Sequence, residues 1–289
     1  MMELTNRIAV LGHRDFFDAG RWAHAVQGEA TAAMIRLGAH IRDPLIMPLG
    51  VVGVDGVTPR FYIHDETDIR RIEFCAGERP MLEGWVRVIR SLPPDACVAD
   101  IGAAAGAYAL SAAFLLPSGT VVAVEPDPES FQRLCWNITL NCFDDRIMAL
   151  PYAIGGSEHP VILYTEGANG PAPSLRDGRF EQSKTVPMCS LDDLVKRGII
   201  PPPLAVKIDV EGAEVDPIDG VFVGMKAIMD KGYPWHIFLE THSAAMVEDF
   251  GGTTSDVLDM LDKRGYKEVF RLDRSKEAPL YHFVREDPM

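Results

Sequence analysis

The sequence has no cluster of basic residues and no long apolar run, and each of these absences removes a class of function. Its 289 residues carry 28 Lys and Arg against 42 Asp and Glu, which gives a net charge of −14. Proteins that bind long nucleic acids rely on clustered basic side chains, so we expect no nucleic-acid partner. The most apolar helical pattern, at 107–116, is too short to span a bilayer, so we expect no membrane partner.

Cysteine is also scarce, and its spacing indicates no metal or disulfide framework. The five cysteines are odd in number and contain no CxxC pair, which argues against both a disulfide scaffold and a zinc site. Cys97 and Cys135 lie within apolar patterns, so we expect both to be small core residues. Residues 1–7 lack the basic start and apolar centre of a secretory signal. We therefore expect a cytoplasmic location.

What remains is enough apolar sequence for a large folded domain. The hydrophobic fraction is 47% and the charged fraction 24%, as in soluble globular proteins. We expect one domain over 61–289 and an N-terminal extension over 1–60 with a helix at 21–37. The apolar stripe of that helix suits a packed cap, a substrate pocket or a homodimer contact, and these alternatives stay open. The acceptor and the oligomeric state are not readable from the sequence.

The stretch 98–106 organises the rest of the chain. An apolar run ends at Asp100, then Gly102 and Gly106 precede an apolar helical pattern. This order is typical of a buried parallel strand that turns into a helix, whose free N–H groups favour a polar or anionic ligand. The next apolar run, 120–124, ends in Glu125. An acid about twenty residues past the glycines is where a carboxylate accepts ribose hydroxyls in doubly wound α/β folds.

A later strand pattern carries charge where a parallel strand is normally apolar. Lys207, Asp209 and Glu211 alternate along 204–211 and would share one side if the strand stayed extended. Carboxylates at the end of a central strand indicate a ligand site; the alternative is a Lys207–Asp209 ion pair with Glu211 capping a helix. A fifth strand, 236–240, ends in Glu240, and His242 follows closely.

Periodicity and turn residues predict the remaining elements. The stretch 167–178, rich in Gly, Pro, Asn and Ser, is predicted as a loop that either closes over substrate or lies at the surface. We expect strands at 60–64, 146–150, 161–165, 266–272 and 280–284, and helices at 65–74, 80–90, 128–138, 190–194 and 255–263.

Five stretches together resemble the FkbM-type family of S-adenosylmethionine-dependent class I methyltransferases, from about residue 61 to the end. They are 98–106, 124–126, 190–194, 206–214 and 239–242. The resemblance implies a doubly wound α/β fold with a seven-stranded sheet, six strands parallel and the last antiparallel. It also implies methyl transfer to the hydroxyl of a small molecule or glycan. One departure is Ala104, where relatives usually carry Asn.

The resemblance also implies roles for individual residues. Asp100, Gly102 and Gly106 would hold the methionine part of the cofactor, with Ala103 in the same turn. Glu125, followed by Pro126, would accept the ribose hydroxyls. The stretch near Ala153 would border the adenine, and Asp209 would end beside the sulfonium.

A hydroxyl acceptor needs a general base, and the sequence offers Asp209, Glu211, Glu240 and His242. We expect Glu211 or His242 to be the base, with Asp209 orienting cofactor or acceptor. No ligand spacing demands a metal, and we predict none. Two other functions stay open: a nicotinamide-dependent oxidoreductase, which the lack of GxGxxG disfavours, and a catalytically silent cofactor-fold binding protein.

Overall fold

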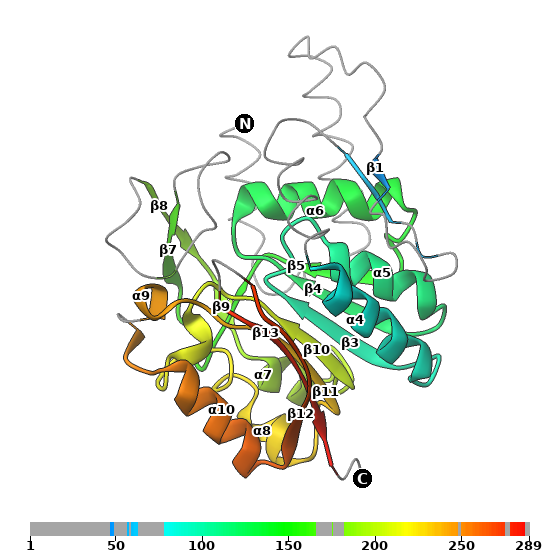
Figure 1. Ribbon diagram of the computed structural model, residues 1–289. Coiled ribbons are helices and arrows are strands. Elements are labelled where there is room, and N and C mark those ends of the chain that lie inside the picture. The colour runs from blue at the N-terminus through cyan, green and yellow to red at the C-terminus, as the bar shows by residue number, and fades with distance from the viewer. Residues whose placement is uncertain are drawn as a thin grey trace.

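Seven strands form one central sheet in the order β12-β13-β11-β10-β3-β4-β5 (Figure 1). The computed structural model describes residues 47–48, 57, 59–62, 78–165, 175, 182–247, 250–274 and 278–286. β13 is antiparallel to both of its neighbours, and the other strands run in one direction. The strands are β3 (Cys97–Ile101), β4 (Thr120–Val124), β5 (Ile147–Leu150), β10 (Ala205–Ile208), β11 (His236–Glu240), β12 (Tyr266–Leu272) and β13 (Leu280–Arg285).

The strand order reverses at β3, and this reversal places the ligand site. The chain moves outward from β3 through β4 to β5, then crosses to β10 on the other side of β3. In open α/β sheets ligands bind at such a switch point, outside the carboxyl ends of the strands. The predicted α/β class and the seven-stranded, mostly parallel sheet are confirmed.

Helices cover both faces of the sheet (Figure 1). One face packs on α4, α5 and α6 through Val98, Val121 and Phe238, and the opposite face packs on α7, α8 and α10 through alternate strand residues. Cys97 and Cys135 are buried in these two layers, as predicted. The bounds are α4 (Arg79–Ser91), α5 (Ala107–Leu115), α6 (Pro128–Leu140), α7 (Leu191–Lys196), α8 (Lys226–Asp230), α9 (Ala244–Val247) and α10 (Thr254–Lys263), with a 3₁₀ turn, η2, at Ala213–Val215.

Local sequence explains where several helices begin. Asp127 and Ser190 each accept a backbone N–H three residues on, at the starts of α6 and α7. Thr253 and Asp256 form a reciprocal capping box at α10. Both α4 and α6 carry Pro in the first turn, where its missing N–H costs no helical hydrogen bond.

Three short strand pairs lie outside the main sheet. β1 (Met47–Pro48) pairs with β2 (Arg60–Phe61), β6 (Ala153–Ile154) with β9 (Met188–Cys189), and β7 (Val161–Thr165) with β8 (Gln182–Val186). The predicted strand at 161–165 is therefore real but belongs to a separate hairpin. No helix in the described ranges combines the length and apolar character needed to cross a membrane.

Some predictions fall outside the described residues and stay predictions. They are the helices at 21–37 and 65–74, nearly all of the loop at 167–178, and the end of the strand predicted at 60–64, of which β2 covers Arg60–Phe61. The division of the chain at residue 60 is likewise untested.

Candidate active site

The turn between β3 and α5 is held so closely against its neighbours that two positions require glycine. Gly102 has φ +78° and Gly106 has φ +92°. In this left-handed region of the backbone, any residue with a Cβ atom is strained. A Cβ on Gly102 would lie 1.6 Å from the carbonyl oxygen of Asp209. The N–H groups of Gly102 and Ala103 both donate to the Val124 carbonyl at 2.9 Å. This turn therefore joins the carboxyl ends of β3, β4 and β10.

Asp100 lies beneath this turn and is only 2% exposed. Its Oδ2 accepts the Ala109 N–H at 2.9 Å, in the first turn of α5. Burial raises the pKa of Asp100 to about 6, although Lys207 and the Ala109 N–H both favour the charged form. The carboxylate thus fixes the helix start, and its predicted contact with the cofactor's ammonium group would add a cation that favours ionisation.

We expect Asp100→Asn to change how stability depends on pH. The native pKa of Asp100, about 6, lies above the unfolded value of about 3.9. Between these values the native state holds a proton that the unfolded state has lost, so this group lowers stability as pH rises. Asn keeps an acceptor for Ala109 but cannot ionise. Relative to the wild type, the variant should therefore gain about 2 kcal/mol in unfolding free energy between pH 4.5 and 6.5.

Urea denaturation of both proteins at the two pH values measures this gain. A difference between variant and wild type that is the same at both pH values would contradict the prediction. It would mean that Asp100 keeps an ordinary pKa in the folded chain.

Glu125 stands at the end of β4 and binds the glycine turn. Its Oε2 accepts the Ala104 N–H and its Oε1 accepts the Asp127 N–H, each at 2.8 Å. These two bonds set the orientation of the carboxylate. Pro126 follows at the start of the next loop. Glu125 is therefore fixed between the glycine turn and the start of α6, and its contact with ribose hydroxyls stays a prediction.

The backbone at Ala104 explains why Asn would suit this position, but nothing in the structure explains the alanine that this chain carries. Ala104 has φ +46°, a left-handed conformation that Asn tolerates and that costs alanine about 1 kcal/mol. We expect Ala104→Gly to raise the free energy of unfolding by about 0.5–1 kcal/mol. Ala105→Gly, at a neighbour without positive φ, is the matched control and should lower it. Urea denaturation compares the two; equal destabilisation of both variants would contradict the assignment.

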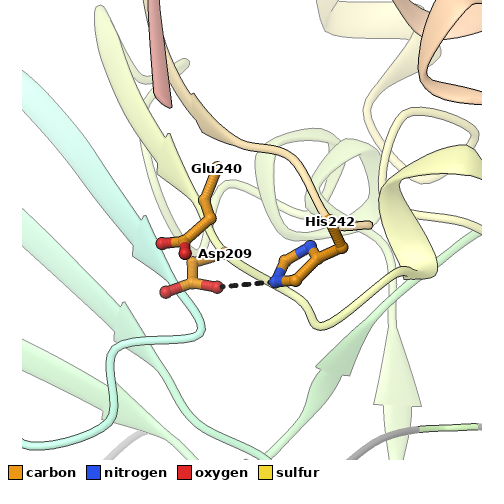
Figure 2. A group of neighbouring side chains, drawn as sticks. All are labelled: Asp209, Glu240 and His242. Atoms are coloured by element: carbon orange, nitrogen blue, oxygen red, sulfur yellow. Dashed lines mark ion pairs between the residues drawn. The ribbon is translucent and has the colours of Figure 1, made fainter. Parts of the chain in front are cut away.

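A group of charged side chains lies beside this turn, where β10 and β11 end (Figure 2). Lys207 is 2% exposed, and its Nζ lies 3.3 Å from Asp209 Oδ2 and 3.6 Å from Glu240 Oε2. The Lys207–Asp209 ion pair, considered above as the alternative to a ligand site, is therefore present. Yet Asp209 Oδ1 and Glu240 Oε2 are buried and have no hydrogen-bond partner among the described residues, so the ion pair does not satisfy both carboxylates.

His242 faces the same group from the segment after β11. Its Nδ1 lies 2.9 Å from Glu214 Oε1, while its Nε2 lies 3.3 Å from Glu211 Oε2 and 3.7 Å from Asp209 Oδ1. Glu214 is itself held, because its Oε2 accepts the Gly212 N–H at 2.9 Å. The imidazole is thus clamped between Glu214 on one side and two carboxylates on the other.

A second layer supports Glu240. Arg274 Nη1 lies 2.8 Å from Glu240 Oε1 and 3.1 Å from Glu78 Oε1, and the Tyr108 hydroxyl donates to Glu78 Oε2 at 3.3 Å. Arg274 comes from the segment between β12 and β13, and Glu78 immediately precedes α4. The segment before α4 and the segment after β12 therefore meet beside Glu240.

Burial and mutual contacts set the charge states of this group. Burial and the nearby Asp209 carboxylate raise the pKa of Glu240 to about 8. Burial also raises the pKa of Glu211. Burial alone would raise the pKa of Asp209, but Lys207 and His242 lower it overall. Burial opposes charge on His242, yet Glu211 and Glu214 raise its pKa well above the usual value.

The structure brings the four predicted catalytic residues, Asp209, Glu211, Glu240 and His242, into one group. The group adjoins the glycine turn through the Asp209 N–H, which donates to the Ile101 carbonyl at 2.9 Å. Ala153 is buried in β6, directly after the two-residue loop that follows β5. Sequence reasoning did not assign roles to Glu214, Glu78 or Arg274. Of these three, Glu214 could have been found from the sequence, because its carboxylate stands two residues past Gly212.

A known protein family matches most of this domain. The methyltransferase FkbM domain matches residues 100–268, more than half of the chain. The chain belongs to the FkbM methyltransferase family. It is therefore an S-adenosylmethionine-dependent methyltransferase, and the nicotinamide-dependent alternative is set aside.

Individual proteins that resemble this FkbM-family chain share little sequence identity with it. The chain is 27% identical over 202 residues to the hexuronic acid methyltransferase AglP of Haloferax volcanii, covering 67% of this chain and 74% of AglP. A putative O-methyltransferase from Klebsiella pneumoniae is 14% identical, with TM-score 0.44, covering 71% of this chain and 78% of that one. Precorrin-6y C5,15-methyltransferase from Geobacter metallireducens is 15% identical, with TM-score 0.42, covering 72% and 89%.

The residues around the turn fit the family's cofactor. Gly102 and Gly106 keep the strand-to-helix turn free of side chains, and Asp100 offers a buried carboxylate beneath it. Glu125 offers an oriented carboxylate at the end of the next strand, where ribose hydroxyls are accepted in related nucleotide folds. A cofactor with an ammonium group, a ribose and a sulfonium finds matching groups here.

Proposed function

We propose that this protein transfers the methyl group of S-adenosylmethionine to a hydroxyl of a sugar or uronic acid. The observation that carries the proposal is the group of Asp209, Glu211 and His242 beside the glycine turn. It supplies carboxylates where an acceptor hydroxyl must lose its proton. The hexuronic acid named for AglP, the relative at 27% identity, supports a sugar acceptor.

Glu211 is the better general base of the two predicted candidates. His242 is clamped by Glu211 and Glu214, and its raised pKa keeps it an imidazolium. An imidazolium has no free lone pair and cannot accept a proton. Glu211 has a raised pKa and a side chain that is 23% exposed, which suits a carboxylate that meets substrate and takes its proton. Glu211 Oε2, beside His242, is the proposed proton acceptor.

The bound cofactor supplies an electrophilic methyl group, and the chain's residues supply position and proton acceptance. Asp209, held by Lys207 and facing His242, orients the groups next to the transfer site. Holding the acceptor oxygen in line with the methyl carbon accounts for much of the rate expected of such an enzyme. His242 keeps Glu211 ionised until the acceptor binds. The four free cysteines in the described residues fit the cytoplasmic location that we include in the proposal.

The proposal is tested by incubating the protein with ¹³C-methyl-labelled cofactor and separate acceptors: glucuronic acid, glucuronosyl disaccharides, glucose and glucosamine. NMR then distinguishes an ether methyl from an ester methyl or an N-methyl group. We expect an ether methyl on a uronic acid or neutral sugar. Labelled product only on the amine or the carboxylate would overturn hydroxyl transfer, and cofactor binding without any product across the panel would favour a silent binding protein.

A further inference from the structure

We propose that Asp209, Glu240 and His242 form a binding site for one divalent metal ion beside the methyl-transfer site. One ligand atom from each residue can be chosen so that all lie within 4.8 Å of one another (Figure 2). Ligands around a first-row metal ion lie about 2.0–2.2 Å from it, so donors in neighbouring coordination positions are about 3 Å apart and donors in opposite positions about 4.2 Å apart. Binding of an ion would therefore draw the three ligand atoms closer together than they lie here. No ligand spacing in the sequence predicts this site.

Two buried oxygens at the centre of this group point to a missing ligand. Asp209 Oδ1 and Glu240 Oε2 have no hydrogen-bond partner among the described residues, and Glu240 is only 5% exposed. A buried carboxylate oxygen without a hydrogen bond has lost its hydration, and a more distant ion pair replaces that loss only in part. Each faces a cation beyond hydrogen-bond range, His242 Nε2 at 3.7 Å and Lys207 Nζ at 3.6 Å. A metal ion would satisfy both oxygens.

The orientation of His242 is the one a metal-binding histidine needs. Metal-bound imidazoles usually donate their second ring N–H to a carboxylate, which fixes the ring and its tautomer. Glu214 Oε1 accepts from Nδ1 at 2.9 Å, and its side chain is fully buried. Nε2 then faces Asp209 and Glu211. In the metal-free chain a proton occupies Nε2 between these carboxylates, and a bound metal ion would replace that proton. In either state Nε2 has no free lone pair, so Glu211 remains the proposed base.

The surrounding charge also favours a metal ion. Lys207 contacts Asp209 and Glu240, and Arg274 contacts Glu78 and Glu240, whereas Glu211 and Glu214 lie against His242. These five carboxyl groups outnumber the two permanent cations. Lys207 contacts Asp209 through Oδ2 and therefore leaves Oδ1 for the metal. Buried charges need partners of opposite sign.

Two carboxylates and one imidazole suit a divalent first-row ion such as Mn²⁺. The ion's role in catalysis rests on the proposed function, whereas its binding does not. The metal would bind the acceptor oxygen and lower the pKa of that hydroxyl. The acceptor proton moves to Glu211, the oxygen forms a bond to the methyl carbon, and the carbon–sulfur bond breaks with its electrons returning to sulfur. No other reactant is needed.

The test titrates the EDTA-treated full chain with MnCl₂ and follows free Mn²⁺ by electron paramagnetic resonance. We expect one bound ion per chain, with affinity at least about tenfold weaker in Asp209→Asn and in His242→Gln. Asp262→Asn, at an exposed carboxylate far from this group in sequence, is the matched control and should bind as the wild type does. Circular dichroism shows whether each variant is folded.

Three results would overturn the metal site. They are no Mn²⁺, Mg²⁺ or Zn²⁺ binding by the wild type up to about 1 mM, binding unchanged in both variants, or equal loss in the Asp262 control. Because binding is measured without acceptor, it is separable from the proposed function. Metal binding without sugar methylation leaves the site standing and refutes the acceptor, whereas EDTA-resistant sugar methylation without metal binding does the reverse.

Discussion

Glu211→Gln should lower kcat for methyl transfer by about 10²- to 10⁴-fold, the range expected when a general base is removed. Gln has nearly the shape of Glu and keeps an acceptor toward His242, but it cannot take the acceptor proton. Glu211 has φ +53°, and Gln preserves the backbone demands of that position as well as Glu does. Cofactor affinity should change by less than about threefold, because the proposed cofactor contacts lie at Glu125 and the glycine turn.

Single-turnover kinetics and calorimetry with the cofactor measure these two effects separately. Glu268→Gln, at an exposed carboxylate on β12, is the matched control and should retain wild-type kcat. The pH profile adds an independent readout. In the wild type kcat should rise with pH as Glu211 ionises, and the variant should lose this rise. A wild-type pH profile in Glu211→Gln would show that the base lies elsewhere.

The site could be located from the sequence because strand ends are local features. Asp100, Glu125 and Glu240 each end an apolar run, and parallel strands bring such ends to one edge. Alternation along an extended strand does not account for the position of Glu211. β10 ends at Ile208, and the chain turns through a positive φ at Glu211. Glu211 reaches His242 because of this turn rather than because of an extended strand.

The supporting contacts could not be predicted, because they join distant segments. Arg274 and Glu78 are 196 residues apart, and no local pattern at either position indicates the other. The strand at Val161–Thr165 was visible from its residues, but its partner β8 follows the loop after it and lacks a strong apolar pattern. Periodicity reveals an element, whereas pairing and long-range ion pairs depend on the assembled sheet.

The glycine at position 102 was interpreted as a cofactor contact, and the structure adds a reason that concerns folding. Its absent side chain makes room for the backbone that directly follows β10, because a Cβ there would lie 1.6 Å from the Asp209 carbonyl oxygen. That oxygen belongs to the backbone next to the Asp209 N–H, which is bonded to Ile101. Neither group can move without separating β3 from β10. Gly102 therefore supports the same strand ends that position Asp209.

We expect Gly102→Ala to lower the free energy of unfolding by at least about 3 kcal/mol, or to prevent folding altogether. The positive φ of +78° costs alanine about 1–2 kcal/mol, and the backbone clash adds the rest. Gly198→Ala separates the two costs, since Gly198 has φ +68° and no atom within 4 Å of the position that a Cβ would take. It should lose only the first amount. Urea denaturation compares them, and equal losses would refute the close approach of Asp209 because only one site has a neighbour to displace.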